Sequence, residues 1–270
     1  DSNGIMMNEI MFRRNMSDEA PVFETTTGPV RVITAASLFD GHDAAINVMR
    51  RLIQSSGAEV IHLGHDRSAK DVVDCAVQED AHAVALTSYQ GGHMEYFTYI
   101  RQLLDEAGCE HVRIFGGGGG TITPPEIRDL HKSGISRIYS PDDGRKMGLM
   151  GMIHDLMGTA SAVDLISDER LASLDGPITA DDMAKVGLLL TLSESASDED
   201  FKAMVEKVRS SEKEVPVIGF TGTGGAGKSS LLDGLMLRIL RDNPDKKVCL
   251  LCVDPTRKRT GGAVSYTHLT

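Results

Sequence analysis

The stretch that decides the fold is VRVITAASLFDGHDAAINVMRRLIQS, residues 30–55. It begins with an apolar, β-branched run at 30–35, continues through a polar loop, and ends in a helical pattern at 44–55. Such a run is typical of a buried strand that leads into a helix. The same alternation recurs four more times. These later strand and helix pairs are predicted at 59–63 with 69–78, 83–88 with 95–107, 112–116 with 125–132, and 137–139 with 145–157.

Five strand and helix pairs in about 130 residues predict an α/β fold, because parallel neighbouring strands need a right-handed helical crossover. The pattern is that of a flavodoxin-like, five-stranded parallel sheet with helices on both faces. With that strand order, ligands bind where the order reverses, between the loops after the first and third strands. We therefore expect a ligand site at these two loops.

Three further segments flank this sheet domain, which we place at residues 29–157. Residues 1–28 have no regular period and are predicted to be a flexible leader. Residues 158–214 show helical periodicity around 181–192 and 198–208, with an N-cap at Thr179, and are predicted to be a helical linker. Residues 215–270 start a second α/β domain, with strands at 215–221 and 248–253 around a helix at 228–240. Because about 55 residues are too few for the sheet that this start implies, we expect a truncated domain.

The composition excludes several classes of protein. Hydrophobic residues make up 41% and charged residues 25%, which is ordinary for a globular protein and excludes a disordered chain. The net charge of −11 argues against binding to nucleic acid or to an anionic membrane surface. No apolar run approaches the roughly 20 residues that a membrane-spanning helix needs. The four cysteines lie in apolar patterns and the sequence does not open with a signal peptide, so we expect a cytoplasmic location.

The most specific motif is GTGGAGKS at residues 222–229, which fits G-x-x-x-x-G-K-[ST] between a predicted strand and a predicted helix. Its glycines let backbone N–H groups turn onto phosphates, Lys228 supplies a positive charge, and Ser229 offers a hydroxyl to Mg²⁺. A turn that only caps a helix would explain the glycines but not the Lys-Ser pair. Asp254 follows the next strand and is either a second Mg²⁺ ligand or a solvated strand-end residue. The predicted nucleotide-binding residues are Gly222, Gly225, Ala226, Gly227, Lys228, Ser229 and Ser230.

The second candidate site is the sequence Asp40-Gly41-His42-Asp43 after the first strand. A lone loop histidine is usually a polar surface residue, but Asp40 is placed to orient the imidazole and fix its tautomer. Two more segments follow strands at the same sheet edge. They are Ser88-Tyr89-Gln90 and a run of five glycines at 116–120. The glycine run is explained either by a bulky ligand that approaches the backbone closely or by a flexible loop without a ligand.

Three other histidines lie near the ends of predicted strands. His62 and His65 flank Gly64 and are either metal ligands or, more commonly, polar loop residues, so they are left unassigned. His93 is either a contact to the ligand or an exposed loop residue.

Together, Asp40-x-His42, the Ser88 segment and the glycine run resemble the D-x-H-x-x-G, S-x-L and GG signature of cobalamin-binding domains in base-off, His-on enzymes. The sequence departs from that signature at Ala45, which replaces a glycine, and at Gln90, which replaces a leucine. A domain of this kind followed by a helical linker, a phosphate loop and Val253-Asp254-Pro255 resembles the fused isobutyryl-CoA mutase family. The resemblance covers about residues 28–263.

This resemblance implies that His42 is the lower axial ligand to cobalt, with Asp40 as its partner. It implies that Ser88 and the glycines line a slot for the displaced nucleotide tail. It also implies adenosylcobalamin, GTP and Mg²⁺ as cofactors, with Ser229 and Asp254 near Mg²⁺. The implied cofactor-binding residues are Asp40, Gly41, His42, Asp43, Ser88, Tyr89, Gln90, Gly116, Gly117, Gly118 and Gly119.

The resemblance thus implies the N-terminal part of an adenosylcobalamin-dependent acyl-CoA carbon-skeleton mutase, of isobutyryl-CoA or butyryl-CoA type, fused to a GTPase chaperone. An acyl-CoA-binding barrel that this sequence lacks and a homodimer are implied as well. No catalytic residue and no mutase activity are expected of this sequence alone. Two alternatives stay open: a corrinoid carrier or sensor with a nucleotide switch, and a phosphoacceptor receiver. Met16 can serve as a start and residues 264–270 leave the family pattern, so residues 1–15 and 264–270 are left unassigned.

Overall fold

The computed structural model describes residues 23–179, 181–209 and 215–251. These residues belong to two compact units, one within residues 1–211 and the other within residues 212–270. Each unit is described by itself. The expectations for residues 1–22 and 252–270, including Asp254, lie outside the described residues.

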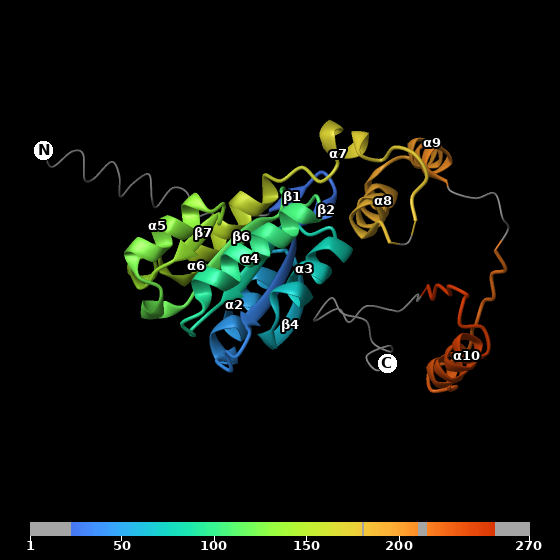
Figure 1. Ribbon diagram of the computed structural model, residues 1–270, viewed down its shortest axis with the longest axis horizontal. Helices are drawn as coiled ribbons and strands as arrows, with labels where there is room; N and C mark the ends of the chain where they lie inside the picture. Colours follow the sequence, from blue (N-terminus) through green and yellow to red (C-terminus); the bar gives the residue numbers. More distant parts are fainter. Residues whose placement is uncertain (1–22, 180, 210–214, 252–270) are drawn as a thin grey trace, which may run out of the picture. The chain divides into compact units, whose positions relative to one another are not determined.

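The first unit is built on a five-stranded sheet in the order β4-β3-β5-β6-β7 (Figure 1). All four neighbouring pairs are parallel. Numbered along the chain, this order is second, first, third, fourth, fifth, so the predicted flavodoxin-like sheet is confirmed and the order reverses between β3 and β5. The strands are β3 (Arg31–Ser37), β4 (Glu59–Arg67), β5 (Ala83–Thr87), β6 (Arg113–Gly117) and β7 (Arg137–Tyr139).

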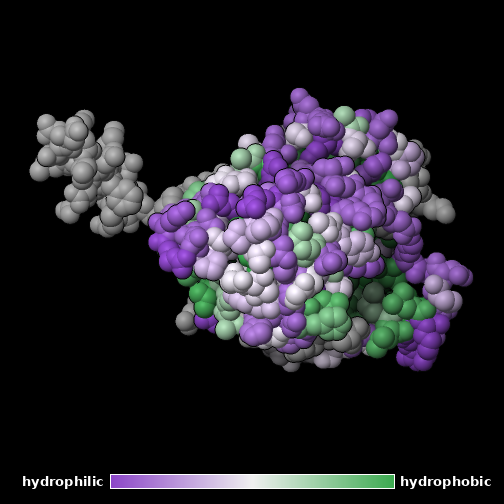
Figure 2. All heavy atoms as spheres, turned by 60° about the vertical axis from the view of Figure 1, so that its left-hand side comes forward, coloured by the Kyte–Doolittle hydropathy of each residue, from purple (hydrophilic) through white to green (hydrophobic). Residues whose placement is uncertain are grey.

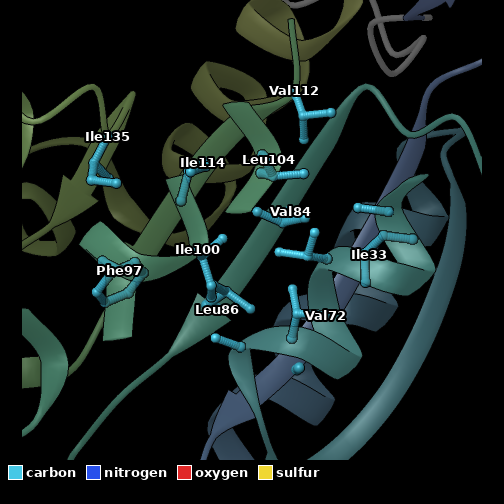
Figure 3. Close-up of a cluster of buried hydrophobic side chains, with 14 of the residues drawn as sticks. Ile33, Val72, Val84, Leu86, Phe97, Ile100, Leu104, Val112, Ile114 and Ile135 are labelled. Carbon is cyan, nitrogen blue, oxygen red and sulfur yellow. The ribbon is translucent and has the colours of Figure 1, made fainter. Parts of the chain in front are cut away.

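Helices cover both faces of this sheet. Successive strand residues point to opposite faces, so Val32 packs into one buried cluster and Ile33 into the other. Figure 3 shows the Ile33 cluster, in which strand residues meet side chains such as Val72 and Phe97 from the covering helices. Because both faces are buried, the central strands read as continuous apolar runs. One face carries α2 (Asp43–Ser55) and α6 (Pro141–Ser161), and the other carries α3 (Ala69–Gln78), α4 (His93–Glu106) and α5 (Pro124–Lys132).

Side-chain caps fix where several of these helices begin. Ser68 and Asp71 form a reciprocal capping box at the start of α3, and Ser140 and Asp143 form another at the start of α6. Pro141 occupies the first turn of α6, where its missing N–H costs nothing. These local signals explain why the predicted and observed starts of α3 agree.

The predicted flexible leader is wrong for its last residues. Strands β1 (Glu24–Thr25) and β2 (Gly28–Pro29) pair in a short antiparallel ladder. The Thr25 hydroxyl donates to the Gly28 carbonyl at 2.9 Å and closes the turn. Gly28 has a φ of 100°, which a glycine adopts without strain. The threonine-rich stretch is therefore a turn.

The predicted helical linker packs against the sheet domain. It contains α7 (Asp168–Ala172), which was not predicted, α8 (Met183–Ser195) and α9 (Asp198–Val208). The N-cap of α8 is Asp182 and not Thr179, since the helix begins at Met183. The Thr179 hydroxyl instead donates to the Asp182 carboxylate at 2.9 Å. Helix α8 lies so close to α3 that a Cβ on Gly187 would sit 2.8 Å from the Val77 carbonyl oxygen.

A buried ion network joins this helical segment to the amino edge of the sheet. The Asp80 carboxylate, 3% exposed, accepts from Arg170 Nη2 at 2.6 Å and from the Thr191 hydroxyl at 2.7 Å. Arg31 lies 3.7 Å from the same carboxylate and donates to Thr191 at 2.5 Å. Asp80 thus bridges β3, α7 and α8.

Two buried histidines border this network and predict an acid-sensitive fold. Burial, aided by Arg31, lowers the pKa of His82 to about 4, and burial, aided by Arg170, lowers the pKa of His111 to about 4. An unfolded histidine titrates near 6.5, so between these pH values the unfolded chain binds more protons than the folded one. The contribution of these two neutral histidines to the free energy of unfolding is therefore fully present above about pH 6.5, and it is lost as the pH falls toward 4.

We expect urea melts to show a loss of about 1 to 3 kcal/mol per histidine between pH 7 and pH 4.5. His82→Asn keeps an acceptor for the Arg31 N–H, which His82 Nδ1 receives at 3.0 Å, and should flatten the pH dependence. His65→Asn removes an exposed imidazole and is the control. An identical pH slope in the wild type and His82→Asn would contradict this account.

In the second unit, α10 (Lys228–Asp242) is the helix assigned among residues 215–251. The predicted strands at 215–221 and at 248–251 are not assigned within these described residues. A strand needs ladder hydrogen bonds from a neighbour, and no described segment pairs with either of them. Their apolar side chains are correspondingly exposed, with Val217 at 92%.

The face drawn in Figure 2 is mostly hydrophilic, with smaller hydrophobic areas near its lower edge. Among the described residues, the helices are too short or too polar to cross a membrane.

Candidate functional site

The loops after β3, β5 and β6 meet at the carboxyl edge of the sheet, where the strand order reverses. The Ser37 hydroxyl at the end of β3 donates to the Ser88 hydroxyl at 3.0 Å, and the Ser88 N–H donates to the Gly117 carbonyl at 2.9 Å. The Tyr89 N–H donates to Asp40 Oδ2 at 2.6 Å. The three segments that the sequence singled out therefore form one site.

Asp40 orients the His42 imidazole. The Asp40 carboxylate is fully buried, and its Oδ1 accepts from the His42 N–H at 3.0 Å and lies 2.8 Å from His42 Nδ1. Burial alone would raise the pKa of Asp40, but the N–H groups of Tyr89 and His42 and the His42 ring outweigh it and hold the pKa below its usual value. An ionised carboxylate only accepts, so Nδ1 carries the hydrogen and Nε2 presents its lone pair. The His42 side chain is 71% exposed, so this lone pair is accessible to a ligand.

A strained turn immediately precedes the buried aspartate. Phe39 has a φ of 63°, a left-handed conformation that costs a non-glycine residue about 1–2 kcal/mol. The Gln90 side-chain amide donates to the Phe39 carbonyl and stabilises the turn. Tyr89 lies beside the site, with its ring centroid 5.5 Å from that of His42.

A cavity of about 490 Å³ opens next to this turn. Its walls come from α2, α6 and the ends of β5 and β6, and they are overwhelmingly apolar. Ala45, which replaces the signature glycine, is part of the wall, as are Tyr89 and the glycines 116–119. A cavity of this size and character suits a largely apolar group. Its other walls include Ile46, Met49, Phe115, Tyr139, Leu149 and Met152.

Packing within the fold already requires two glycines of the 116–120 run. A Cβ on Gly118 would lie 1.9 Å from the Ser88 carbonyl oxygen, and a Cβ on Gly116 would lie 2.4 Å from Phe97 Cζ. A Cβ on Gly117 would make an ordinary contact, and Gly120 has open space around it. Close approach of strands and loops, and not only of a ligand, therefore explains the run.

Thr87 and the α6 wall of the cavity were not predicted from the sequence. Thr87 lines the cavity, and its buried hydroxyl has no hydrogen-bond partner among the described residues. Strand alternation could have found it, because Thr87 lies on the same face of β5 as Ala83 and Ala85. The α6 wall carries no motif and could not have been found in this way.

The phosphate loop of the second unit leads directly into α10. Gly225 and Gly227 have φ values of 75° and 82°, which glycine adopts without strain. Lys228 Nζ donates to the carbonyls of Gly222 and Thr223 at 2.8 and 2.9 Å, so the ammonium lies across the loop. Ser229 and Ser230 follow in the first turn of α10, where unpaired N–H groups favour phosphate. The other predicted residue, Ala226, lies within the loop, and its N–H donates to the Thr223 carbonyl at 3.3 Å.

Comparison with protein families matches two parts of the chain. Residues 30–142 match the B12 binding domain, and residues 186–267 match the Methylmalonyl Co-A mutase-associated GTPase MeaB. The first match contains the Asp40–His42 site, and the second contains the phosphate loop. The two domains support cobalamin and GTP as ligands.

Curated relatives extend this result. The chain is 51% identical over 244 residues to the fused isobutyryl-CoA mutase of Geobacillus kaustophilus and 52% identical over 240 residues to that of Nocardia farcinica. Each match covers 87% of this chain and 22% of the relative, so the chain spans about a fifth of these proteins. It is also 31% identical over 115 residues to the 2-hydroxyisobutanoyl-CoA mutase small subunit of Aquincola tertiaricarbonis, which covers 42% of this chain and 82% of that subunit. The chain therefore belongs to the fused isobutyryl-CoA mutase family, of which it carries the B12-binding domain and a MeaB-type GTPase segment.

Proposed function

We propose that the sheet domain binds cobalamin with its nucleotide base displaced from cobalt and His42 Nε2 in the lower axial position. The observation that carries this proposal is the pairing of an exposed imidazole, fixed in its tautomer by Asp40, with an apolar cavity beside it. A neutral imidazole nitrogen is a good ligand for a transition metal, and a carboxylate behind it raises its basicity. The residues present therefore fit the group.

The cavity of about 490 Å³ is the slot for the displaced nucleotide tail. The glycines 116–119 line this cavity, and the Ser88 N–H donates to the Gly117 carbonyl beside them. The apolar walls from α2 and α6 would exclude water from the inserted base. Two further predicted residues flank His42: Gly41 lies in the loop, and Asp43 is the first residue of α2.

For the intact protein we propose an adenosylcobalamin-dependent acyl-CoA carbon-skeleton mutase of isobutyryl-CoA or butyryl-CoA type. When bound, adenosylcobalamin supplies homolytic cobalt–carbon bond chemistry. This chain orients the axial imidazole and shields the tail, while an acyl-CoA site and a homodimer interface would come from the intact protein. The names of the relatives, all of them acyl-CoA mutases or a mutase subunit, support this over a carrier or sensor. Thiols that are not in disulfides, such as Cys75 and Cys109, support a cytoplasmic location.

His42→Ala tests the axial assignment. We expect wild-type protein to bind cobalamin and, after reduction to the cobalt(II) form, to show an electron paramagnetic resonance pattern that changes when histidine is labelled with ¹⁵N. The variant should lose the label-dependent pattern and bind at least about tenfold more weakly. His65→Ala, which removes an exposed imidazole within β4 and not in a loop as the sequence predicted, is the matched control. A label-dependent pattern that persists in His42→Ala would refute the assignment.

We further propose that residues 222–230 bind the phosphates of GTP, with Mg²⁺ held by Ser229 and by Asp254. Lys228→Ala removes the one ammonium that lies across the loop in the described part of this unit. We expect binding of Mg-GTP by the intact protein, measured by calorimetry, to weaken by tenfold or more, about 1.4 kcal/mol. Lys246→Ala changes an exposed lysine outside the loop and should bind normally. Equal affinity in both variants would count against the phosphate-loop assignment.

A further inference from the structure

His93 is neither an exposed loop residue nor a wall of the cavity. It is the first residue of α4, and it is only 3% exposed. Its Nδ1 lies 3.1 Å from the Gln90 carbonyl oxygen, and its Nε2 lies 3.4 Å from Glu126 Oε2 on α5. A buried imidazole directly after the loop that serves the ligand site needs an explanation beyond packing.

We propose that His93 and Gln90 form a positioning pair that sets the orientation of His42. The inference rests on the proposed role of His42 as an axial ligand, and it assigns the pair no contact with the cofactor. It deepens that role by naming the residues that hold the histidine loop in place.

Two hydrogen bonds connect the loop after β5 to the loop after β3. The Gln90 amide donates to the Phe39 carbonyl, and the Tyr89 N–H donates to Asp40 Oδ2. Both bonds fall on the turn that buries Asp40 and exposes His42. The position of residues 89–90 therefore determines where the Asp40 carboxylate lies, and through it which way the His42 ring points.

The chain immediately after these residues is weakly constrained. Gly91 and Gly92 have open space around them and bring a high conformational entropy. His93 closes this short segment back onto Gln90 by its Nδ1 contact with the Gln90 carbonyl. The imidazole thus holds in place the residue whose side chain supports the Phe39 turn.

The departure at position 90 fits this arrangement. The signature residue, leucine, has no donor for the Phe39 carbonyl, whereas the Gln90 amide supplies one. Gln90 is thus a second polar support for a turn that is strained at Phe39, where φ is 63°.

The chemistry of His93 gives a sharp set of variants. A carbonyl oxygen only accepts, so His93 Nδ1 must carry the hydrogen. Asparagine places an amide nitrogen near the position of Nδ1, while glutamine places one near Nε2. His93→Asn should therefore restore the contact to Gln90, and His93→Gln and His93→Ala should not.

The first readout uses the protein without cofactor. In ¹⁵N-histidine NMR spectra at pH 8, wild-type His42 should be mainly the Nδ1–H tautomer. His93→Ala, His93→Gln and Gln90→Leu should shift His42 toward a mixture of tautomers, and His93→Asn should resemble wild type. The second readout is affinity for cobalamin, which should fall about threefold to tenfold in the first three variants and less than twofold in His93→Asn. His65→Ala is the control for loss of an imidazole.

Thermal melts followed by circular dichroism establish that each variant is folded; if His93→Ala is not, the comparison of His93→Asn with His93→Gln decides. The inference is overturned if His93→Asn and His93→Gln behave alike, or if the His42 tautomer is unchanged in all variants. The failure of the proposed function gives a different pattern: wild type would not bind cobalamin, while the His42 tautomer would still respond to His93. That pattern would keep the positioning pair and reject its link to cobalt.

Discussion

Gly118→Ala is expected to lower the free energy of unfolding of the sheet domain by more than about 3 kcal/mol and to abolish cobalamin binding. The added Cβ would lie 1.9 Å from the Ser88 carbonyl oxygen and 3.0 Å from its carbonyl carbon. Both atoms belong to the backbone, so no side-chain rotation relieves the overlap. The Ser88 segment must therefore move. This movement displaces the neighbouring Tyr89 N–H, which donates to Asp40 Oδ2 at 2.6 Å.

Gly120→Ala is the matched control, because nothing lies within 4 Å of the position where its Cβ would be. Both variants add one methyl group to the same glycine run, so they differ in the overlap with Ser88. Urea denaturation followed by circular dichroism measures the stability of each, and titration with cobalamin measures binding. Equal stability of the two variants would show that the loop relaxes around the added methyl group. Packing would then not be the reason why position 118 is a glycine.

Asp80→Ala is expected to destabilise the first unit by about 3–5 kcal/mol, because it leaves the Arg170 guanidinium without its carboxylate and leaves Arg31 with only Glu194 as an acidic partner. The side chains of Arg31 and Arg170 are 10% and 14% exposed, so water cannot replace the lost partner well. Alanine also tolerates the left-handed backbone at this position poorly, since Asp80 has a φ of 46°. Asp80→Asn keeps the shape, an acceptor and tolerance of that backbone, and should cost less.

Hydrogen exchange locates the damage. Helix α8 should lose protection before β3 does, because Thr191 on α8 donates directly to Asp80. Asp74→Ala removes an exposed carboxylate that pairs with Lys70 four residues earlier, and should leave stability and exchange unchanged. If Asp80→Ala were no more destabilising than Asp74→Ala, the network would not stabilise the fold.

The sheet domain could be predicted from sequence because its signals are local and repeated. Apolar runs that are covered on both faces and the need for helical crossovers together predict a parallel sheet. The limits of α3, 69–78, agree with the prediction for the same reason. The Asp40–His42 pair was also predictable, because two residues of separation place the carboxylate beside the ring.

The remainder depends on contacts between distant residues. In the sequence, Asp80 has the pattern of an ordinary acidic loop residue. Only the folded chain brings it close to Arg31, Arg170 and Thr191. The role of Gly118 depends on Ser88, thirty positions away. The strands expected around the phosphate loop are not assigned among the described residues for a related reason, since their apolar pattern is local but their pairing partners are not. Pattern alone could not supply these partners.

The position of α8 has a practical consequence for anyone who divides this gene into separate domains. The match to the GTPase family begins at residue 186, inside α8. Nevertheless α8 packs on α3, and its Thr191 donates to Asp80. A cut between α7 and α8 would leave Arg31, Asp80 and Arg170 at a newly exposed surface without Thr191. A cut just after Val208, where α9 ends, keeps the contacts of α8 with α3 and with Asp80 intact.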